Sequence, residues 1–258
     1  MVYTDIYSYL RVTARMIGNS RFGNKMALKG GTVLVTKMLE NNRYDLVRLT
    51  QDLDIHCSDK NIWVDFYNNI EDILNQNDYG LQYKIVDRRS IKKGLDLSDS
   101  LKFELLDRNN GSTVHFKIDM NIKPNSVVTF EYNPNLNMTT YDAITMMTDK
   151  IHAISSEKIF RRIKDLYDIS VLASLYDFSY LSIKKHIEVK FGSIENLKNM
   201  LTSTNIDGII HAYEKYNAFL NEKPDIRIVW SIVEAFVKPF YCNWKEELTW
   251  NHRIGRWV

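Results

Sequence analysis

The sequence predicts an α+β fold, with a mixed sheet and flanking helices over residues 1–138 and a mainly helical domain over residues 139–258. Alternating apolar and polar residues at 101–106 and 113–122, joined by Asn109-Asn110-Gly111, predict a β-hairpin in the first part. After Tyr141 the apolar residues instead recur at helical spacing, as in Ala143, Ile144, Met147, Ile151 and Ile154. This change of period divides the chain.

Composition bounds the class of protein. Of 258 residues, 45% are hydrophobic and 26% charged, which is ordinary for a soluble protein with a core. The net charge of +2 excludes a strong overall attraction to nucleic acid, so such binding would need a local patch. Cys57 and Cys242 lie far apart without metal-ligand spacing, which fits a reduced compartment. With neither a signal peptide nor an apolar run of bilayer length in the sequence, we expect a cytoplasmic protein.

The first elements follow from local patterns. Residues 6–17 have one apolar stripe and predict a helix, and the short apolar run 26–28 leads into a Gly-Gly turn. A strand is expected over 51–57. An amphipathic helix is expected over 62–74, with Ile62, Phe66, Ile70 and Ile73 as its buried side. Residues 83–86 read as a strand, and the basic run 88–93 as a loop.

The Gly-Gly turn has the features of a phosphate-binding loop. The run Lys29-Gly30-Gly31-Thr32 precedes an apolar helical segment, so free backbone N–H groups at the helix start would attract an anion. Glycine at both positions allows a phosphate to approach the backbone closely. Taken alone, Gly-Gly is more often an ordinary turn.

Three aspartates suggest a metal site. Asp52 and Asp54 are two residues apart in a predicted strand and therefore project to one face, while Leu53 and Ile55 turn towards the core. Asp119 has the same apolar neighbours in the second hairpin strand, whose polar face also carries His115, Lys117 and Asn121. Clustered carboxylates repel unless a cation lies between them, and Mg²⁺ prefers oxygen ligands. A paired or solvated structural aspartate is the alternative for each.

The helical part carries a second charged group of residues. Lys150 lies beside the apolar stripe of its predicted helix, and the next predicted helix, over 159–176, contains the run from Arg161 to Asp168. Arg161 with Asp165, and Lys164 with Asp168, are four residues apart, so ordinary surface ion pairs also explain the pattern. Aromatic residues are dense near the end of the chain, and we expect them to form a core rather than a base-stacking surface.

These residues together resemble the AbiEii/MenT family of nucleotidyltransferase toxins, which belongs to the DNA polymerase β-like superfamily. The resemblance rests on Lys29-Gly30-Gly31-Thr32, Arg48-x-Thr50-x-Asp52-x-Asp54, Asp119, Lys150 and the Lys164-Asp165-Leu166-Tyr167-Asp168 run, over about residues 25–175. The commoner Arg-Asp before Leu-Tyr-Asp is Lys164-Asp165 here, which keeps the charge and loses the guanidinium fork.

The resemblance implies a polymerase β-like mixed sheet whose active-site cleft is completed by the helical domain. It implies an NTP donor, Mg²⁺, a cognate antitoxin, a role in phage defence, and a tRNA 3′ end as acceptor. The implied catalytic residues are Asp52, Asp54, Asp119, Lys150 and Asp168, and the first three would hold two metal ions. The implied nucleotide-binding residues are Lys29, Gly30, Gly31, Thr32, Arg48 and Lys150.

The acceptor is the least constrained part of this interpretation. A polyanionic RNA needs local basic residues, and two clusters qualify. The first is Arg88, Arg89, Lys92 and Lys93. The second, which we favour because it follows Lys150, is Lys158, Arg161, Arg162 and Lys164. A solvated helix face explains the second cluster equally well. Two alternatives stay open: nucleotidylation of a protein or small molecule, and a non-catalytic module that binds nucleotide or a partner.

Overall fold

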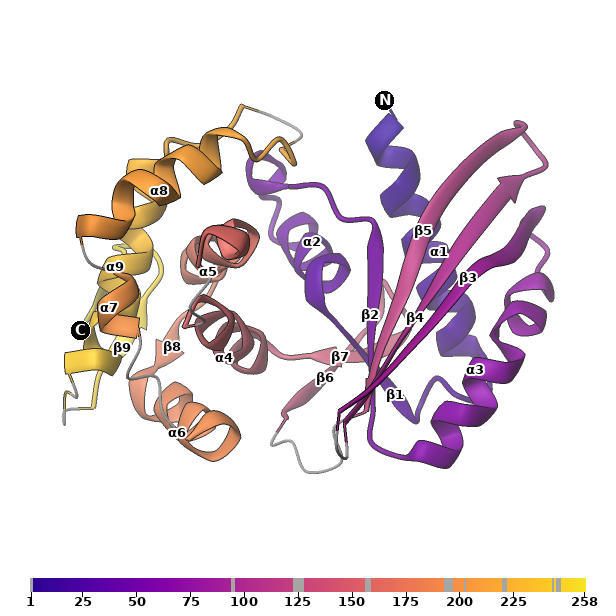
Figure 1. The fold of residues 1–258 in the computed structure, drawn as a ribbon, viewed down its shortest axis with the longest axis horizontal. Helices are drawn as coiled ribbons and strands as arrows, with labels where there is room; N and C mark the ends of the chain where they lie inside the picture. The colour runs from indigo at the N-terminus through magenta and orange to yellow at the C-terminus, as the bar shows by residue number, and fades with distance from the viewer. Residues whose placement is uncertain are drawn as a thin grey trace. The chain divides into compact units, whose positions relative to one another are not determined.

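The computed structural model describes residues 2–93, 96–122, 128–155, 159–192, 197–201, 203–219, 222–242, 244 and 247–258. It contains two compact units (Figure 1). The sheet unit comprises Met1–Glu40, Leu49–Ser126 and Phe130–Tyr141, and the helical unit comprises Asn41–Arg48, Val127–Thr129 and Asp142–Val258. Arg48, four residues before Asp52, therefore belongs to the helical unit. The division of the chain after residue 138 stays a prediction.

A seven-stranded mixed sheet forms the sheet unit, in the order β3-β4-β5-β2-β1-β7-β6. Strand β2 pairs in parallel with β5 and antiparallel with β1, while β1 and β7 are parallel. The predicted α+β class is confirmed, and so is the Asn-Gly hairpin between β4 and β5. The strands are β1 (Met26–Lys29), β2 (Asp52–Cys57), β3 (Leu81–Lys93), β4 (Asp96–Asp107), β5 (Ser112–Ile122), β6 (Phe130–Asn133) and β7 (Met138–Tyr141).

One face of this sheet is apolar and buried. Leu53 and Ile55 of β2 are in register with Ile118 and Met120 of β5, and all four side chains are fully buried. Residues in register share a face, so the core row continues into β4 through Leu101. The polar residues of β2 and β5 therefore project from the opposite face, as the alternation predicts.

Helices α1 (Val2–Asn19) and α3 (Lys60–Asn75) cover the apolar face. The Trp63 Nε1 atom donates to Asp99 Oδ2 over 2.6 Å, and Thr13 hydrogen-bonds with Tyr83 over 3.0 Å. The two helices meet where Phe22, just beyond α1, packs edge-on against Phe66 of α3. The buried side of α3 differs in part from the expected one, since Ile62 and Ile73 are only half-buried. Its fully covered residues are Trp63, Phe66, Ile70 and Leu74.

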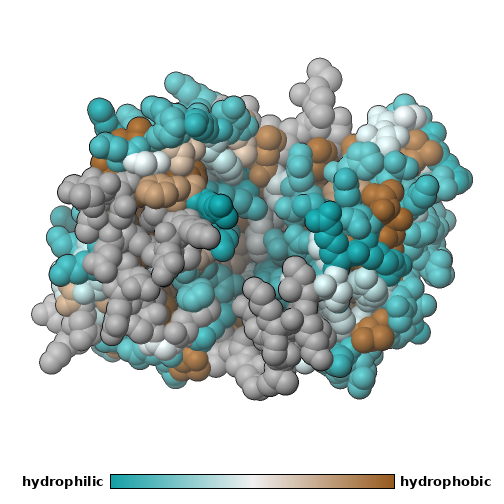
Figure 2. Space-filling view, viewed as in Figure 1, coloured by the Kyte–Doolittle hydropathy of each residue, from teal (hydrophilic) through white to brown (hydrophobic). Residues whose placement is uncertain are grey.

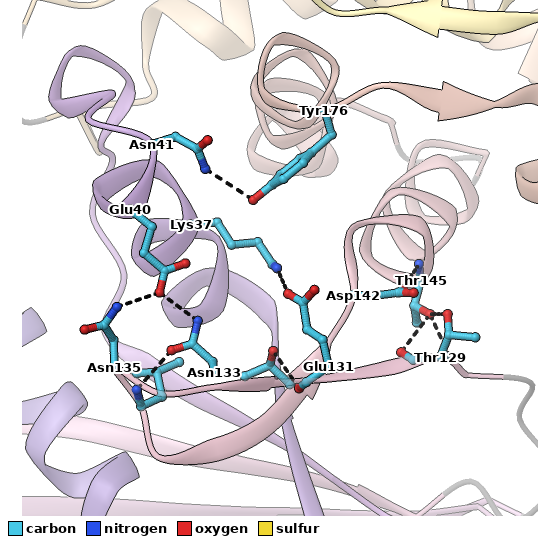
Figure 3. Close-up of polar contacts among 12 residues, drawn as sticks. Lys37, Glu40, Asn41, Thr129, Glu131, Asn133, Asn135, Asp142, Thr145 and Tyr176 are labelled. Atoms are coloured by element: carbon cyan, nitrogen blue, oxygen red, sulfur yellow. Dashed lines mark hydrogen bonds and ion pairs between the residues drawn. The ribbon is translucent and has the colours of Figure 1, made fainter.

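Helix α2 (Gly30–Glu40) is fastened at its far end to the hairpin of β6 and β7 (Figure 3). Lys37 forms an ion pair with Glu131, and Glu40 accepts hydrogen bonds from Asn133 and Asn135 over 2.9 and 2.8 Å. The hairpin itself has no strong alternating pattern in the sequence and was not predicted. It fixes the direction of α2, and therefore the position of the Gly-Gly turn at its start.

The basic run Arg88-Arg89-Ser90-Ile91-Lys92-Lys93 is a strand rather than the expected loop, because β3 extends to Lys93. The register shifts at a bulge between Ile85 and Asp87, and pairing with β4 continues beyond it. Arg88 and Arg89 therefore project to opposite faces of the sheet. Consecutive charged residues are typical of a solvent-exposed loop, but backbone pairing to a neighbouring strand overrides that local preference.

The helical unit contains α4 (Ala143–Ile154), α5 (Ile163–Leu175), α6 (Tyr180–Phe191), α7 (Leu197–Met200), α8 (Ser203–Glu214) and α9 (Ile226–Cys242). Short strands β8 (Phe178–Ser179), β9 (Thr249–Asn251) and β10 (Arg256–Trp257) form a second sheet. Trp250 is fully buried, packs against Phe236 and Trp257, and donates from Nε1 to the Ala173 carbonyl over 2.7 Å. Trp230, Phe236 and Trp250 are thus core residues, as expected, whereas Trp244 is exposed.

Where the chain is described, none of its helices has the length and apolar character needed to cross a membrane. The view in Figure 2 shows mainly hydrophilic residues, with apolar ones scattered among them.

We predict that Trp63→Phe destabilises the protein by about 1–3 kcal/mol, because Asp99 is buried and would lose its indole donor. Urea unfolding followed by circular dichroism measures the loss. Val64→Ala, on the same helix at a side chain that is 46% exposed, is the control and should change stability by less than about 0.5 kcal/mol. Equal effects of the two substitutions would contradict a specific role for the hydrogen bond.

Candidate active site

The candidate site residues fall into two clusters, one in each unit. In the sheet unit, Asp54 of β2 is in register with Lys29 of β1 and with Asp119 of β5. Neighbouring strands lie about 4.8 Å apart, so the Asp54 and Asp119 side chains start side by side on the polar face. Asp52 projects from the same face two residues earlier, in register with Lys117. All three aspartates are half-buried.

Gly30 brings the start of α2 against the Asp54 carboxylate. Its φ of +74° is rarely adopted by other residues, and a Cβ there would lie 1.9 Å from Asp54 Oδ2. Glycine is therefore required twice, for the backbone conformation and for the close approach. The first backbone N–H groups of α2 lie beside this turn and have no partner within the helix. The predicted phosphate-binding loop and one of the predicted metal ligands are thus adjacent.

Thr32 fixes the strand to the helix. Its Oγ1 donates to the Asp52 carbonyl over 2.8 Å, and its side chain is fully buried. A phosphate contact at Thr32 would therefore use the backbone N–H, because the hydroxyl already donates to β2. This hydrogen bond fixes the position of the start of α2 along strand β2.

Two aromatic contacts on this face were missed from the sequence. The Lys29 ammonium lies 5.9 Å from the centre of the Tyr141 ring. His56, which is buried, lies with its ring centre 5.7 Å from that of Tyr141. His56 continues the two-residue spacing of Asp52 and Asp54, which was the available signal for it. No comparable signal marked Tyr141, because β7 was not predicted.

The carboxylates fit a divalent cation by chemistry, since Mg²⁺ prefers carboxylate oxygens and Asp54 and Asp119 start side by side. Among the described residues, however, no group of three or more His, Cys, Asp or Glu side chains is arranged to hold a metal ion. The three-carboxylate metal site therefore stays a prediction. Its backbone positions share one sheet face.

The second cluster is a buried network of charges in the helical unit. Arg48 Nε donates to Asp168 Oδ1 over 2.5 Å and Arg48 Nη2 to Asp168 Oδ2 over 2.8 Å, and both side chains are fully buried. The Lys150 ammonium lies 2.7 Å from Asp165 Oδ1 and 2.7 Å from Asp168 Oδ2. Its side chain is 12% exposed, whereas that of Arg48 is fully buried, so Lys150 is the cation of this pair that can reach an anionic ligand with less rearrangement.

The charges in this network stabilise one another. Burial alone would raise the pKa of the Asp168 carboxyl, but Arg48 and Lys150 hold it well below its ordinary value. Burial would lower the pKa of Lys150, whereas Asp168 and then Asp165 raise it above its ordinary value. Lys150 is therefore a permanent cation and Asp168 a permanent anion at neutral pH.

The segment before β2 is held by α5 through more than this ion pair. The Tyr167 hydroxyl donates to the Leu46 carbonyl over 2.8 Å, and Arg48 forms an isolated backbone bridge with Phe219. The rings of Tyr167 and Phe219 pack edge to face, with centres 4.9 Å apart. A phosphate contact by Arg48, one of the predicted roles, would require opening its pair with Asp168.

The ion pairs of α5 differ from the expected surface pairs. Asp165 pairs with Lys150, and with Arg162 over 3.7 Å, while Asp168 pairs with Arg48 and Lys150. Lys150 and Arg48 come from other parts of the chain and Arg162 is three residues from Asp165, so the four-residue spacing within the helix did not reveal these partners.

The two predicted RNA-binding clusters have different surroundings. Arg161 and Arg162 are exposed and Lys164 is half-buried, while Lys158 lies outside the described residues. In the other cluster, Arg88 donates to the Tyr67 carbonyl of α3 over 3.0 Å, whereas Arg89 pairs with Asp87 over 2.9 Å. Lys92 and Lys93 belong to β3, and their side chains lie outside the description.

Comparison with known proteins gives a family and a fold. Residues 11–234 match the family model described as nucleotidyl transferase AbiEii toxin, type IV TA system. The chain is similar to JHP933 from Helicobacter pylori, with a TM-score of 0.57 and 15% identity over 93% of this chain and 92% of that one. It is also similar to a candidate nucleotidyltransferase from H. pylori, with a TM-score of 0.55 and 14% identity over 93% and 95%. The comparison with curated proteins gives no match.

We predict that Arg48→Met destabilises the protein by about 3–5 kcal/mol, because it leaves the buried Asp168 carboxylate without its guanidinium partner. Denaturant unfolding measures the loss. Arg43→Met is a matched control, since Arg43 also grips Asp45 with two nitrogens but both side chains are partly exposed. That control should cost less than about 1 kcal/mol. A small effect at Arg48 would show that the buried pair does not anchor the segment.

The lowered pKa of Asp168 also predicts a pH dependence. Its ionisation stabilises the folded state above the ordinary value of 3.8, and this contribution is lost as the pH falls below that value. In urea unfolding between pH 3 and 6, Asp168→Asn should therefore lose less stability on acidification than the wild type. The expected difference approaches about 1.4 kcal/mol per pH unit below pH 3.8. If the free energy of unfolding fell equally with decreasing pH in the two proteins, Asp168 would not be the source of the pH dependence.

Proposed function

The chain belongs to the AbiEii family of nucleotidyl transferase toxins of type IV toxin–antitoxin systems, and we propose that it transfers a nucleoside monophosphate from an NTP to an RNA acceptor, the 3′ end of tRNA. The observation that carries this proposal is the contact of Gly30 with the Asp54 carboxylate, next to Asp119. It combines a backbone surface suited to phosphates with carboxylates suited to a cation, which is the combination that an NTP and its metal require.

The sheet-unit cluster has a defined chemical task in this proposal. The acceptor hydroxyl attacks the α-phosphorus, and the bond to the leaving pyrophosphate breaks. Backbone N–H groups of Gly30, Gly31 and Thr32 hold the β- and γ-phosphates, and the Lys29 ammonium compensates their charge. Nucleotidyltransferases generally use a divalent metal. Mg²⁺ held by Asp52, Asp54 and Asp119 would neutralise charge on the reacting oxygens and lower the pKa of the acceptor hydroxyl.

The cluster in the helical unit has a different task. We assign Lys150 to the leaving pyrophosphate, because its ammonium is held in the charged state and its side chain is 12% exposed. Asp168 is too firmly ionised to act as a proton donor at neutral pH, so its role is to orient Lys150. Arg48 then acts as a positioning residue that holds Asp168 with a bidentate contact.

Family membership implies an antitoxin partner and an NTP substrate. The tRNA acceptor and a role in phage defence are part of our proposal, and both rest on the family resemblance of the sequence. The same proposal implies that expression without the antitoxin arrests growth.

The function is tested by incubating the purified protein with Mg²⁺, each labelled NTP in turn, and total RNA or cell lysate. We predict that label from at least one NTP enters tRNA. Asp54→Asn and Asp119→Asn should each reduce labelling by about 100-fold or more, because each removes a charged ligand of the metal. Labelled protein or small molecule without labelled tRNA would contradict the acceptor, and no labelled product at all would contradict the transfer.

Two glycine variants distinguish an effect on the Asp54 carboxylate from the backbone strain that both substitutions cause. Gly30→Ala should abolish labelling, because the new Cβ would displace the Asp54 carboxylate. Gly111→Ala is the control, since Gly111 has a similar φ of +72° but open space around it. Both variants carry a strain of about 1–2 kcal/mol, and only the first should lose activity. Equal activity of the two would contradict the site at Gly30.

A further inference from the structure

Two lysines lie opposite each other on the polar face of the sheet unit. Lys102 of β4 and Lys117 of β5 are directly in register, and both side chains are exposed. Lys117 is in turn in register with Asp52 and is two residues from Asp119 on its own strand. Two residues span about 7 Å along a strand, so the lysine pair adjoins the carboxylates.

The ammonium groups of this pair are not engaged in ion pairs. Within the described part of the chain, neither ammonium forms an ion pair or side-chain hydrogen bond. The acidic neighbour of Lys102 on β3 is Asp87, and that carboxylate pairs with Arg89 over 2.9 Å. Like charges directly opposite each other destabilise a pair of strands. Asp52 and Asp87 flank the pair in register, but neither carboxylate forms an ion pair with these lysines, so an anionic ligand would give the two ammonium groups the partner that they lack in the described part of the chain.

The position of Lys102 and Lys117 indicates the kind of anion that they bind. The next row on this face of the sheet, two residues along, contains Lys29, Asp54, Asp119, Ser100 and Arg89 in successive strands. The Arg89 side chain is 78% exposed. The basic residues thus continue from the carboxylates along β5, β4 and β3, across more than one strand spacing. A single small phosphate would occupy one such position, whereas a chain of phosphates spans several.

We propose that Lys102 and Lys117 bind the phosphate backbone of the nucleic acid acceptor next to its reacting end. This inference rests on the proposed function and specifies its acceptor surface, which differs from both basic clusters expected from the sequence. Those expectations depended on charges consecutive in the chain. Lys102 and Lys117 are fifteen residues apart in numbering and are brought together by the hairpin register.

The test compares tRNA binding by the wild type, Lys102→Ala/Lys117→Ala and Lys25→Ala/Lys60→Ala, by fluorescence anisotropy at several salt concentrations without NTP. Lys25 and Lys60 are exposed lysines of the same unit, so the control removes the same net charge. We expect the Lys102/Lys117 variant to bind about tenfold more weakly. Its log–log salt dependence should be shallower by about 1.4–1.8 units, for two lost phosphate contacts. The control should resemble the wild type.

A charge reversal distinguishes binding from folding. Lys102→Glu places an acid opposite Lys117, so the strands should become more stable while tRNA binding weakens. A raised melting temperature with weakened binding supports the proposal. A lowered melting temperature with unchanged binding would assign the lysines to the fold and overturn it.

Labelling with NTP identifies which inference fails. If the wild type labels tRNA and the Lys102/Lys117 variant keeps the wild-type affinity and salt slope, the surface is wrong and the proposed function stands. If the wild type labels only protein or binds no tRNA, the acceptor and the surface are both wrong. Equal loss of binding in the variant and in the Lys25/Lys60 control would also overturn the proposal, because it would reflect net charge alone.

Discussion

The register of β2 between β1 and β5 is the constraint on which the candidate site depends. Side chains of a strand alternate between faces, so a slip by one residue would turn Asp52 and Asp54 into the core and Leu53 and Ile55 outwards. The burial of Leu53 and Ile55 stabilises the correct register by about 1.5–3 kcal/mol for each side chain. The hydrogen bond from Thr32 to the Asp52 carbonyl then fixes α2 to that register. The Gly-Gly turn meets Asp54 because these two constraints agree.

The network of Arg48, Asp168 and Lys150 also fixes the position of a site residue, through charges instead of apolar side chains. A buried pair contributes little net stability compared with apolar residues of similar size, because both charges are taken out of water. What it supplies is a fixed geometry, since the planar guanidinium donates to both carboxylate oxygens in one orientation. Asp168 in that orientation keeps its Oδ2 atom for Lys150 as well. The network therefore makes better sense as a device that positions a cation than as a source of stability.

The sequence predicted the parts of this protein that depend on local patterns. The Asn-Gly hairpin, the strand with Asp52 and Asp54, and the polar face of β5 follow from alternation and turn chemistry, and all are present. The strand pairing of residues 88–93, the hairpin of β6 and β7, and the partners of Arg48 were missed. Each of these depends on a contact between residues distant in the chain. A run of charges or a single arginine has no local signature of such a partner.

On the polar face of the sheet, the fold tolerates repulsion between like charges on neighbouring strands. Asp54 and Asp119 are adjacent on one row, and Lys102 and Lys117 on the next, so like charges face each other twice. Each such pair of like charges across neighbouring strands costs about 1 kcal/mol or less. The opposite face of the same strands buries Leu53, Ile118 and Leu101 completely, at about 1.5–3 kcal/mol each. The apolar face therefore outweighs the repulsion, and the polar face can keep like charges side by side. An NTP with its metal, and the phosphates of an acceptor, have the opposite charges that such a face requires.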